Sequence, residues 1–211
     1  GFLPEAEMHR RTAGSTPYEL GHDAAKYPLD RVLTMAELAS SRSTDVAASR
    51  QSAEVALPKL RDGLKDGDSG VRYWAALGLA MRDAAAVNAA REELRAALKD
   101  ESPSVRIAAA RALGLHGKSD DLALVLPVLK ALAAPDKNGV FVSLEALSTI
   151  EALEKKADPL REFLRTMPRQ DPNANDRTTS YVPRMLEHLL GEKAAAAETG
   201  KAKRAKRKAA A

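Results

Sequence analysis

The sequence contains no cysteine, few aromatic residues and no long hydrophobic run. Without cysteine the chain can form neither a disulfide nor a thiolate metal site, and it has no cysteine nucleophile. Aromatic residues make up only 4% of the chain, which argues against a β-sheet fold because strands are enriched in them. No apolar segment approaches the roughly 20 residues that a membrane-spanning helix needs, so we expect no membrane span.

The sequence is rich in alanine, and its charge is unevenly distributed. Hydrophobic residues make up 45% of the chain, with alanine, the strongest helix former, as the largest contributor. The net charge is +4, but residues 192–211 alone contribute an excess of positive charge, and the rest of the chain is close to neutral. A near-neutral body argues against nucleic acid as a partner.

One segment of the sequence recurs after 34 residues. The repeated residue types are Leu, Asp, Val and Arg, found at Leu64, Asp66, Val71 and Arg72 and again at Leu98, Asp100, Val105 and Arg106. A degenerate third copy follows, with a turn predicted at residues 135–139 and Val140 at the position where the repeat predicts an arginine. Internal repeats with a period of about 20–50 residues indicate a solenoid of stacked units.

This Leu-x-Asp-x-x-x-x-Val-Arg pattern resembles HEAT repeats of the bacterial type, in which Asp closes a turn and Val-Arg begins the second helix. The resemblance implies an all-α fold, an α-solenoid of HEAT-like helical repeats. We predict an irregular segment at residues 1–27 and repeats at 28–167. A loop and a capping helix are expected at 168–191, and a disordered basic tail at 192–211.

Four residues are candidate structural positions of the repeat: Asp66, Arg72, Asp100 and Arg106. The two aspartates are expected either to accept backbone amides or to pair with the two arginines. A structural role is favoured over ligand binding for all four. No residue is expected to be catalytic, to bind a cofactor or to hold a metal.

Two further residues lie on predicted helix faces. Trp74, the only tryptophan, falls beside Val71 and Leu77 and is expected in the core. His116 ends an apolar stripe next to Gly117, which favours a packed or capping role. No two histidines have the i, i+4 spacing of a helical metal site.

The N-terminal residues carry a second resemblance. Residues 1–8 (Gly-Phe-Leu-Pro-Glu-Ala-Glu-Met) and 16–23 (Thr-Pro-Tyr-Glu-Leu-Gly-His-Asp) are similar to the end of the catalytic domain of bacterial arylsulfatase-like enzymes, hydrolases of the alkaline-phosphatase superfamily. In that family such a segment leads into C-terminal HEAT repeats. Since the chain begins at Gly1, we interpret it as a fragment or processed piece of such an enzyme.

This resemblance implies a non-catalytic HEAT-repeat module for interaction or packing at the C-terminus of a sulfatase-like hydrolase. The expected partner is the sulfatase-like catalytic domain or another protein. The parent enzyme would use calcium, with no cofactor in this chain, and a periplasmic or secreted location would follow. The family motif Cys/Ser-x-Pro-x-Arg is missing: its nearest match, residues 15–19, ends in Glu19, so no catalytic residue is assigned.

Two other functions are alternatives to a module of a sulfatase-like enzyme. A stand-alone HEAT-repeat scaffold would bind another protein through its concave face. A HEAT-like enzyme acting on nucleic acid is the third class, and the near-neutral body and scarce aromatic residues argue against it. An upstream α/β domain with a Cys/Ser-x-Pro-x-Arg motif would separate the first two.

Overall fold

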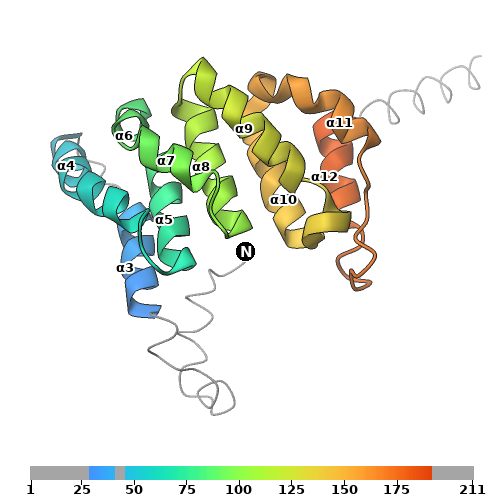
Figure 1. The fold of residues 1–211 in the computed structure, drawn as a ribbon, viewed down its shortest axis with the longest axis horizontal. Coiled ribbons are helices and arrows are strands. Elements are labelled where there is room, and N and C mark those ends of the chain that lie inside the picture. Colours follow the sequence, from blue (N-terminus) through green and yellow to red (C-terminus); the bar gives the residue numbers. More distant parts are fainter. Residues whose placement is uncertain (1–28, 41–45, 192–211) are drawn as a thin grey trace, which may run out of the picture. The chain divides into compact units, whose positions relative to one another are not determined.

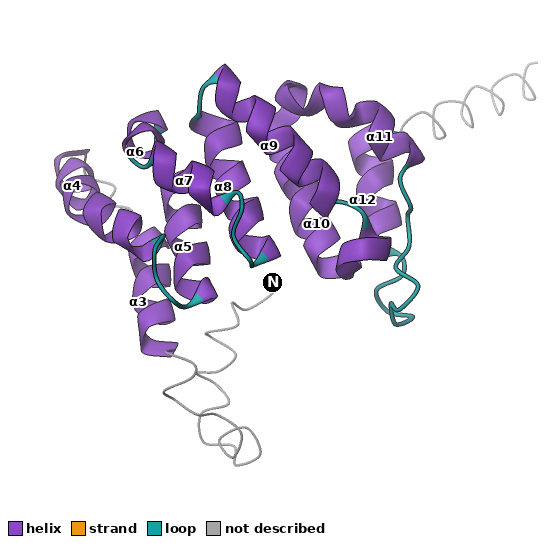
Figure 2. Ribbon diagram, viewed as in Figure 1, coloured by secondary structure: helices purple, strands orange, loops and turns teal. Residues whose placement is uncertain are grey.

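A computed structural model describes residues 29–40 and 46–191 of the chain. The predicted irregular segment at 1–27 and the predicted tail at 192–211 lie outside the described residues. Within the described ranges the regular elements are all helices, and no strand occurs there (Figure 2). The prediction of an all-α fold of helical repeats is confirmed.

The chain divides into two compact units, residues 1–122 and 123–211, which we describe separately. The helices of the first unit are α3 (Leu29–Ser40), α4 (Val46–Gly63), α5 (Ser69–Ala80), α6 (Ala84–Ala89), α7 (Arg91–Ala97) and α8 (Pro103–His116), followed by the start of α9 (Ser119–Leu132). In this unit α5 packs between α3 and α8, while α4 packs on α5 and both α6 and α7 pack on α8 (Figure 1). The unit therefore has two layers, α3–α5–α8 and α4–α6–α7.

Two helices of the first unit, α5 and α6, each begin after an aspartate that accepts their free amides. Asp68 precedes α5 and accepts hydrogen bonds from the amides of Gly70 and Val71 at 2.8 and 3.2 Å. Asp83 does the same for α6. Such N-caps satisfy donors that have no partner inside the helix. The starts of α5 and α6 thus follow from the positions of these two aspartates, whereas α7 and α8 begin without a side-chain cap.

Small side chains let the two layers approach closely. Ala75 and Ala76 of α5 are fully buried. A Cβ atom on Gly78 would lie 2.8 Å from Cδ2 of Leu60 in α4 and 3.0 Å from the Cα atom of Ala39 in α3. Glycine at position 78 therefore allows α5 to pack closely against both α3 and α4 at this one position.

The second unit contains the rest of α9, then α10 (Pro135–Leu153), a 3-10 helix (Glu154–Leu160), α11 (Arg161–Thr166) and α12 (Tyr181–Leu190). The turn predicted at residues 135–139 is a first turn of helix, separated from the rest of α10 by Gly139 with φ 79°. Ser143 is fully buried, and its hydroxyl donates to the carbonyl oxygen of Ala133 at 2.6 Å. The end of α9 is thereby tied to α10.

Candidate interaction site

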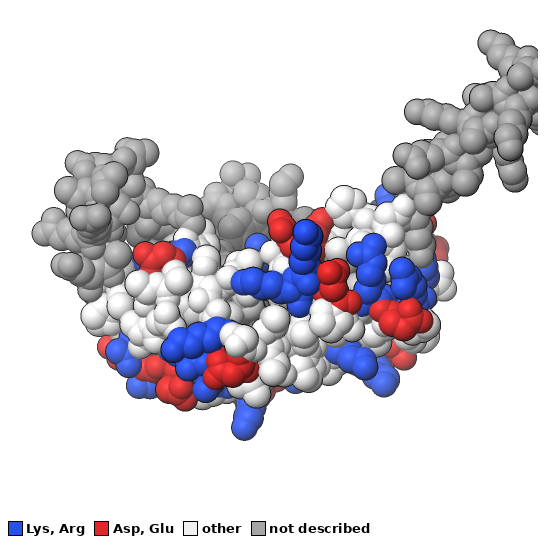
Figure 3. All heavy atoms as spheres, turned by 90° about the horizontal axis from the view of Figure 1, so that it is seen from above, with Lys and Arg blue, Asp and Glu red and all other residues white. Residues whose placement is uncertain are grey.

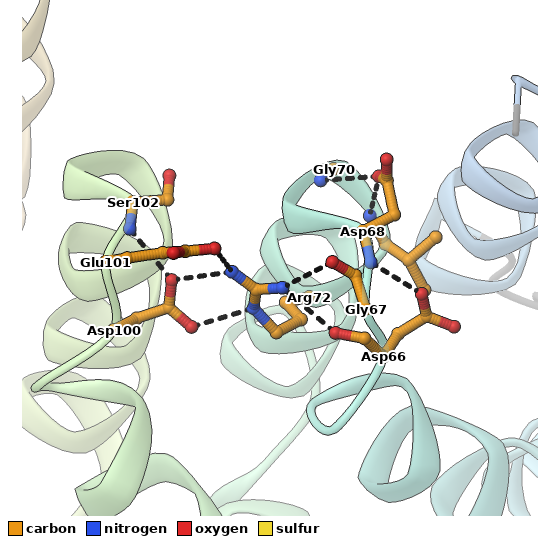
Figure 4. A network of polar contacts seen from close by, with 9 residues as sticks. Asp66, Gly67, Asp68, Gly70, Arg72, Asp100, Glu101 and Ser102 are labelled. Carbon is orange, nitrogen blue, oxygen red and sulfur yellow. Dashed lines mark hydrogen bonds and ion pairs between the residues drawn. The ribbon is translucent and has the colours of Figure 1, made fainter. Parts of the chain in front are cut away.

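Arg72, in the first turn of α5, connects the turn of its own repeat to the turn of the next. Its Nε and Nη2 atoms donate to the two carboxylate oxygens of Asp100 at 2.7 and 2.9 Å. Its Nη1 atom donates to the main-chain carbonyls of Asp66 and Gly67 at 2.9 and 3.1 Å (Figure 4). Glu101 adds an exposed ion pair at 3.3 Å. Arg72 is only 8% exposed, so this contact is a buried polar link between two repeats.

The turn aspartates play the same local role in both repeats. Asp66 accepts the amide of Asp68 at 2.8 Å, and Asp100 accepts the amide of Ser102 at 2.9 Å. Asp68 and Ser102 are the residues immediately before α5 and α8. Of the two roles expected for the aspartates, the amide acceptor is thus seen in both. Asp100 also has the other expected role, because it pairs with Arg72, but the sequence pattern did not say that this arginine would come from the preceding repeat.

Arg106, the fourth candidate position, does not repeat the contacts of Arg72. Its Nε atom is buried and has no hydrogen-bond partner among the described residues. In the register of the repeat, the residue that follows Asp100 by 34 positions is Ala134, which has no carboxylate. The structure therefore brings Asp66, Arg72 and Asp100 together and leaves Arg106 outside this cluster.

A second polar cluster joins α7 to the start of α9 within the first unit. Asp121 is fully buried and receives the Nε atoms of Arg91 and Arg95 at 2.8 and 2.6 Å, while its exposed neighbour Asp120 pairs with both arginines. Asp121 also accepts the amide of Lys118 at 2.8 Å, in the manner of a capping box. In the sequence, Arg91 and Arg95 are four residues apart and Asp120 directly precedes Asp121. The two pairs are separated by about one repeat, so a pattern read along one helix did not link them.

Burial and hydrogen bonding act in opposite directions on the carboxyl group of Asp100. Burial alone would raise its pKa, but hydrogen bonds from Arg72 and from the amide of Ser102, with the positive charges of Arg72 and Arg106, outweigh it. The pKa of Asp100 is therefore lowered. The pKa of Asp121 is lowered too, because the hydrogen bonds from Arg91, Lys118 and Arg95 outweigh the effect of burial. Both carboxylates are stabilised in their charged form by the fold.

We expect the free energy of unfolding to fall when the pH is lowered below about 4. Because the unfolded chain binds protons at the ordinary carboxyl pKa, near 4, the stabilisation is complete above that value and is lost as the pH falls through the lower folded-state values. Urea unfolding at pH 7, 5 and 3 measures this, and Asp100→Asn should weaken the dependence. An unfolding free energy that stays constant from pH 7 to pH 3 would contradict the role of these carboxylates.

A stripe of half-exposed side chains runs along α5 and α8. We call it the α5–α8 stripe, and its members are Tyr73, Trp74, Leu77, Met81, Arg111 and Leu115. Leu77 and Arg111 occupy equivalent positions of successive repeats, 34 residues apart, and so do Met81 and Leu115. Since α5 and α8 pack side by side in one layer, equivalent positions face the same way. The stripe therefore includes equivalent positions of two successive repeats, although Ile107 and Ala108, the α8 equivalents of Tyr73 and Trp74, are buried.

Trp74 lies in this stripe and not in the core, which corrects the expectation from the sequence. The buried row of α5 is Val71, Ala75 and Leu79, at i, i+4 and i+8. Trp74 lies outside that row and is half exposed. Its ring packs edge-on against Tyr73, with centroids 5.5 Å apart. His116, for which a packed or capping role was expected, is also half buried, and its Nε2 atom lies 3.1 Å from the carbonyl oxygen of Ala80.

Arg111 is the charged member of the α5–α8 stripe. It is half buried and forms no ion pair or hydrogen bond in the part of the chain that the structure describes. The equivalent positions of the neighbouring repeats hold Leu77 and Glu145, so the repeat pattern does not fix the residue type at this position. The stripe is thus an apolar and aromatic surface whose one cation has no partner among the described residues.

Residues 29–40 and 46–191 contain neither a metal site nor a membrane span. No group of His, Asp and Glu side chains in these ranges is arranged to hold a metal ion. None of the described helices is both long and apolar enough to cross a bilayer. On the face seen in Figure 3, basic and acidic side chains are interspersed, which is unlike the single-sign surface of a nucleic-acid-binding protein.

The two-layered helices and the half-buried stripe are those of a helical-repeat scaffold. The family model for HEAT repeats matches residues 57–148 and 92–174, which together cover more than half of the chain. The chain belongs to the HEAT-repeat family, as its 34-residue pattern predicted. No curated protein and no solved structure matches it, and nothing in these comparisons links it to sulfatases.

Proposed function

We propose that this chain is a non-catalytic module that binds another protein through the α5–α8 stripe. The observation that carries the proposal is the composition of the stripe. Protein interfaces are enriched in Tyr, Trp, Met and Arg, and Tyr73, Trp74, Met81 and Arg111 supply one of each. Tryptophan, tyrosine and arginine are also the residues that most often dominate binding energy. HEAT repeats are scaffolds for protein interaction, which agrees with this assignment.

A finer proposal concerns the protein to which the module belongs. We propose that it forms the C-terminal part of a sulfatase-like hydrolase and packs on or presents substrates to that catalytic domain. The support is the similarity of residues 1–8 and 16–23 to the end of such a domain. The parent would use calcium to offset the charge of the sulfate ester, and its nucleophile would come from a Cys/Ser-x-Pro-x-Arg site elsewhere in the protein. A stand-alone scaffold is the alternative.

Aryl-sulfate turnover in the presence of calcium tests this finer proposal. We expect no turnover by residues 1–211, because the nucleophile motif is missing, and calcium-dependent turnover by the full reading frame that contains them. Inactivity of the full reading frame would sink the sulfatase assignment and favour the stand-alone scaffold. Turnover by residues 1–211 alone would contradict the non-catalytic assignment itself.

A further inference from the structure

The chemistry of Arg111 restricts what can cover the α5–α8 stripe. A partner that covers the stripe removes water from the guanidinium, and desolvating an unpaired charge is costly. The described residues offer Arg111 no carboxylate in compensation. A carboxylate on the partner would supply it, because the planar guanidinium matches a carboxylate with two parallel hydrogen bonds. Arg72 and Asp100 already form such a pair inside the protein.

The residues near Arg111 determine which other side chains the partner should carry. Leu77 is the α5 equivalent of Arg111, Met81 directly follows α5, and Leu115 lies one turn further along α8, so the repeat places apolar residues at the positions next to Arg111. Packed helices lie about 8–10 Å apart, a distance that a short peptide segment spans. We propose that the α5–α8 stripe binds an acidic protein segment in which carboxylates alternate with aromatic or large aliphatic side chains. This inference rests on the proposed function and names the chemistry of the partner.

Other occupants fit the stripe less well. A second copy of the chain, related by a two-fold axis, would bring two Arg111 side chains into one interface whose stripe contains no carboxylate. A nucleic acid or an anionic membrane is held by many cations, and the stripe has one. An acidic segment with apolar side chains can pair a carboxylate with Arg111 and pack on the apolar side chains that make up most of the stripe.

Selection of peptides on the full chain tests the inference. A phage library of random 16-residue peptides is selected on immobilised residues 1–211, and the affinities of enriched peptides are measured by calorimetry. We expect enriched peptides to combine Asp or Glu with aromatic or aliphatic residues. Arg111→Glu and Trp74→Ala should each weaken their binding at least tenfold. Arg165→Glu, a change at an exposed arginine of α11, is the matched control and should leave the affinity unchanged.

Each result of the selection decides something. Enriched peptides without acidic residues, or binding that is insensitive to Arg111→Glu but weakened by Trp74→Ala, would overturn the acidic partner and leave the stripe as a binding surface. Binding insensitive to both substitutions, or no enrichment, would contradict the proposed function as well. Analytical ultracentrifugation of the chain alone tests whether a second copy of the chain covers the stripe. A dimer that Trp74→Ala abolishes would assign the stripe to a second copy and overturn the inference. Circular dichroism and the melting temperature establish that each variant is folded.

Discussion

Replacing Arg72 with alanine is expected to lower the free energy of unfolding by about 3–5 kcal/mol, the usual effect of breaking a buried ion pair from one side. The substitution leaves the carboxylate of Asp100, with a side chain only 11% exposed, without its two charged hydrogen bonds. It also removes the donor to the carbonyls of Asp66 and Gly67. Urea unfolding of the variant and the wild-type chain measures the difference.

Two further variants separate the buried link from an ordinary surface charge. Arg165→Ala removes an exposed arginine whose partner is Glu162, and it should change stability by no more than about 0.5 kcal/mol. The combination of Arg72→Ala with Asp100→Ala should cost clearly less than the sum of the two single changes, because the second removes the charge that the first leaves unpaired. Additive effects, or a loss below about 1 kcal/mol for Arg72→Ala, would contradict a buried link between the repeats.

Enlarging Gly78 is expected to have an effect of similar size. Gly78→Leu should lower the free energy of unfolding by about 3 kcal/mol, because the added atoms meet Leu60 and the main chain of Ala39. Gly78→Ala should cost about 1–2 kcal/mol, since the close contact outweighs the roughly 1 kcal/mol that alanine contributes to helix stability. Thermal and urea unfolding of both variants give the values.

Gly67 provides the matched control for this second prediction. It is exposed, and no atom lies within 4 Å of the position that its Cβ would take. Gly67→Ala should therefore change the stability by no more than about 0.5 kcal/mol. If Gly78→Leu were as stable as the wild-type chain, α5 could not approach α3 and α4 as closely as the structure shows.

The helical fold was predictable because its signals are local. The spacing of Leu98, Asp100 and Val105 describes a turn followed by a helix, and the hydrogen bond from the amide of Ser102 to Asp100 spans only two residues. The pairing of Arg72 with Asp100 spans 28 residues and exists only because two repeats stack. Contacts of that kind depend on packing, so a pattern read along one repeat did not reveal them.

The candidate interaction site was harder to predict, for the same physical reason. The spacing of Trp74 from Val71 and Leu77 is compatible with two neighbouring faces of α5, and the packing of α3, α4 and α8 decides which face is buried. Arg111 carried no clear signal either, since the equivalent positions of the neighbouring repeats hold Leu77 and Glu145. Whether this position contributes to a binding surface therefore depends on how the helices pack, which the sequence alone does not show.

The fluorescence of Trp74 tests most directly whether the α5–α8 stripe is the binding surface. Trp74 is the only tryptophan of the chain, so its emission reports on this one position. When an enriched acidic peptide is titrated into residues 1–211, we predict a saturable shift of the emission to shorter wavelengths and protection from acrylamide quenching. Both effects should be lost in Arg111→Glu. A peptide that binds by calorimetry and leaves the emission and quenching of Trp74 unchanged would show that the binding surface lies elsewhere.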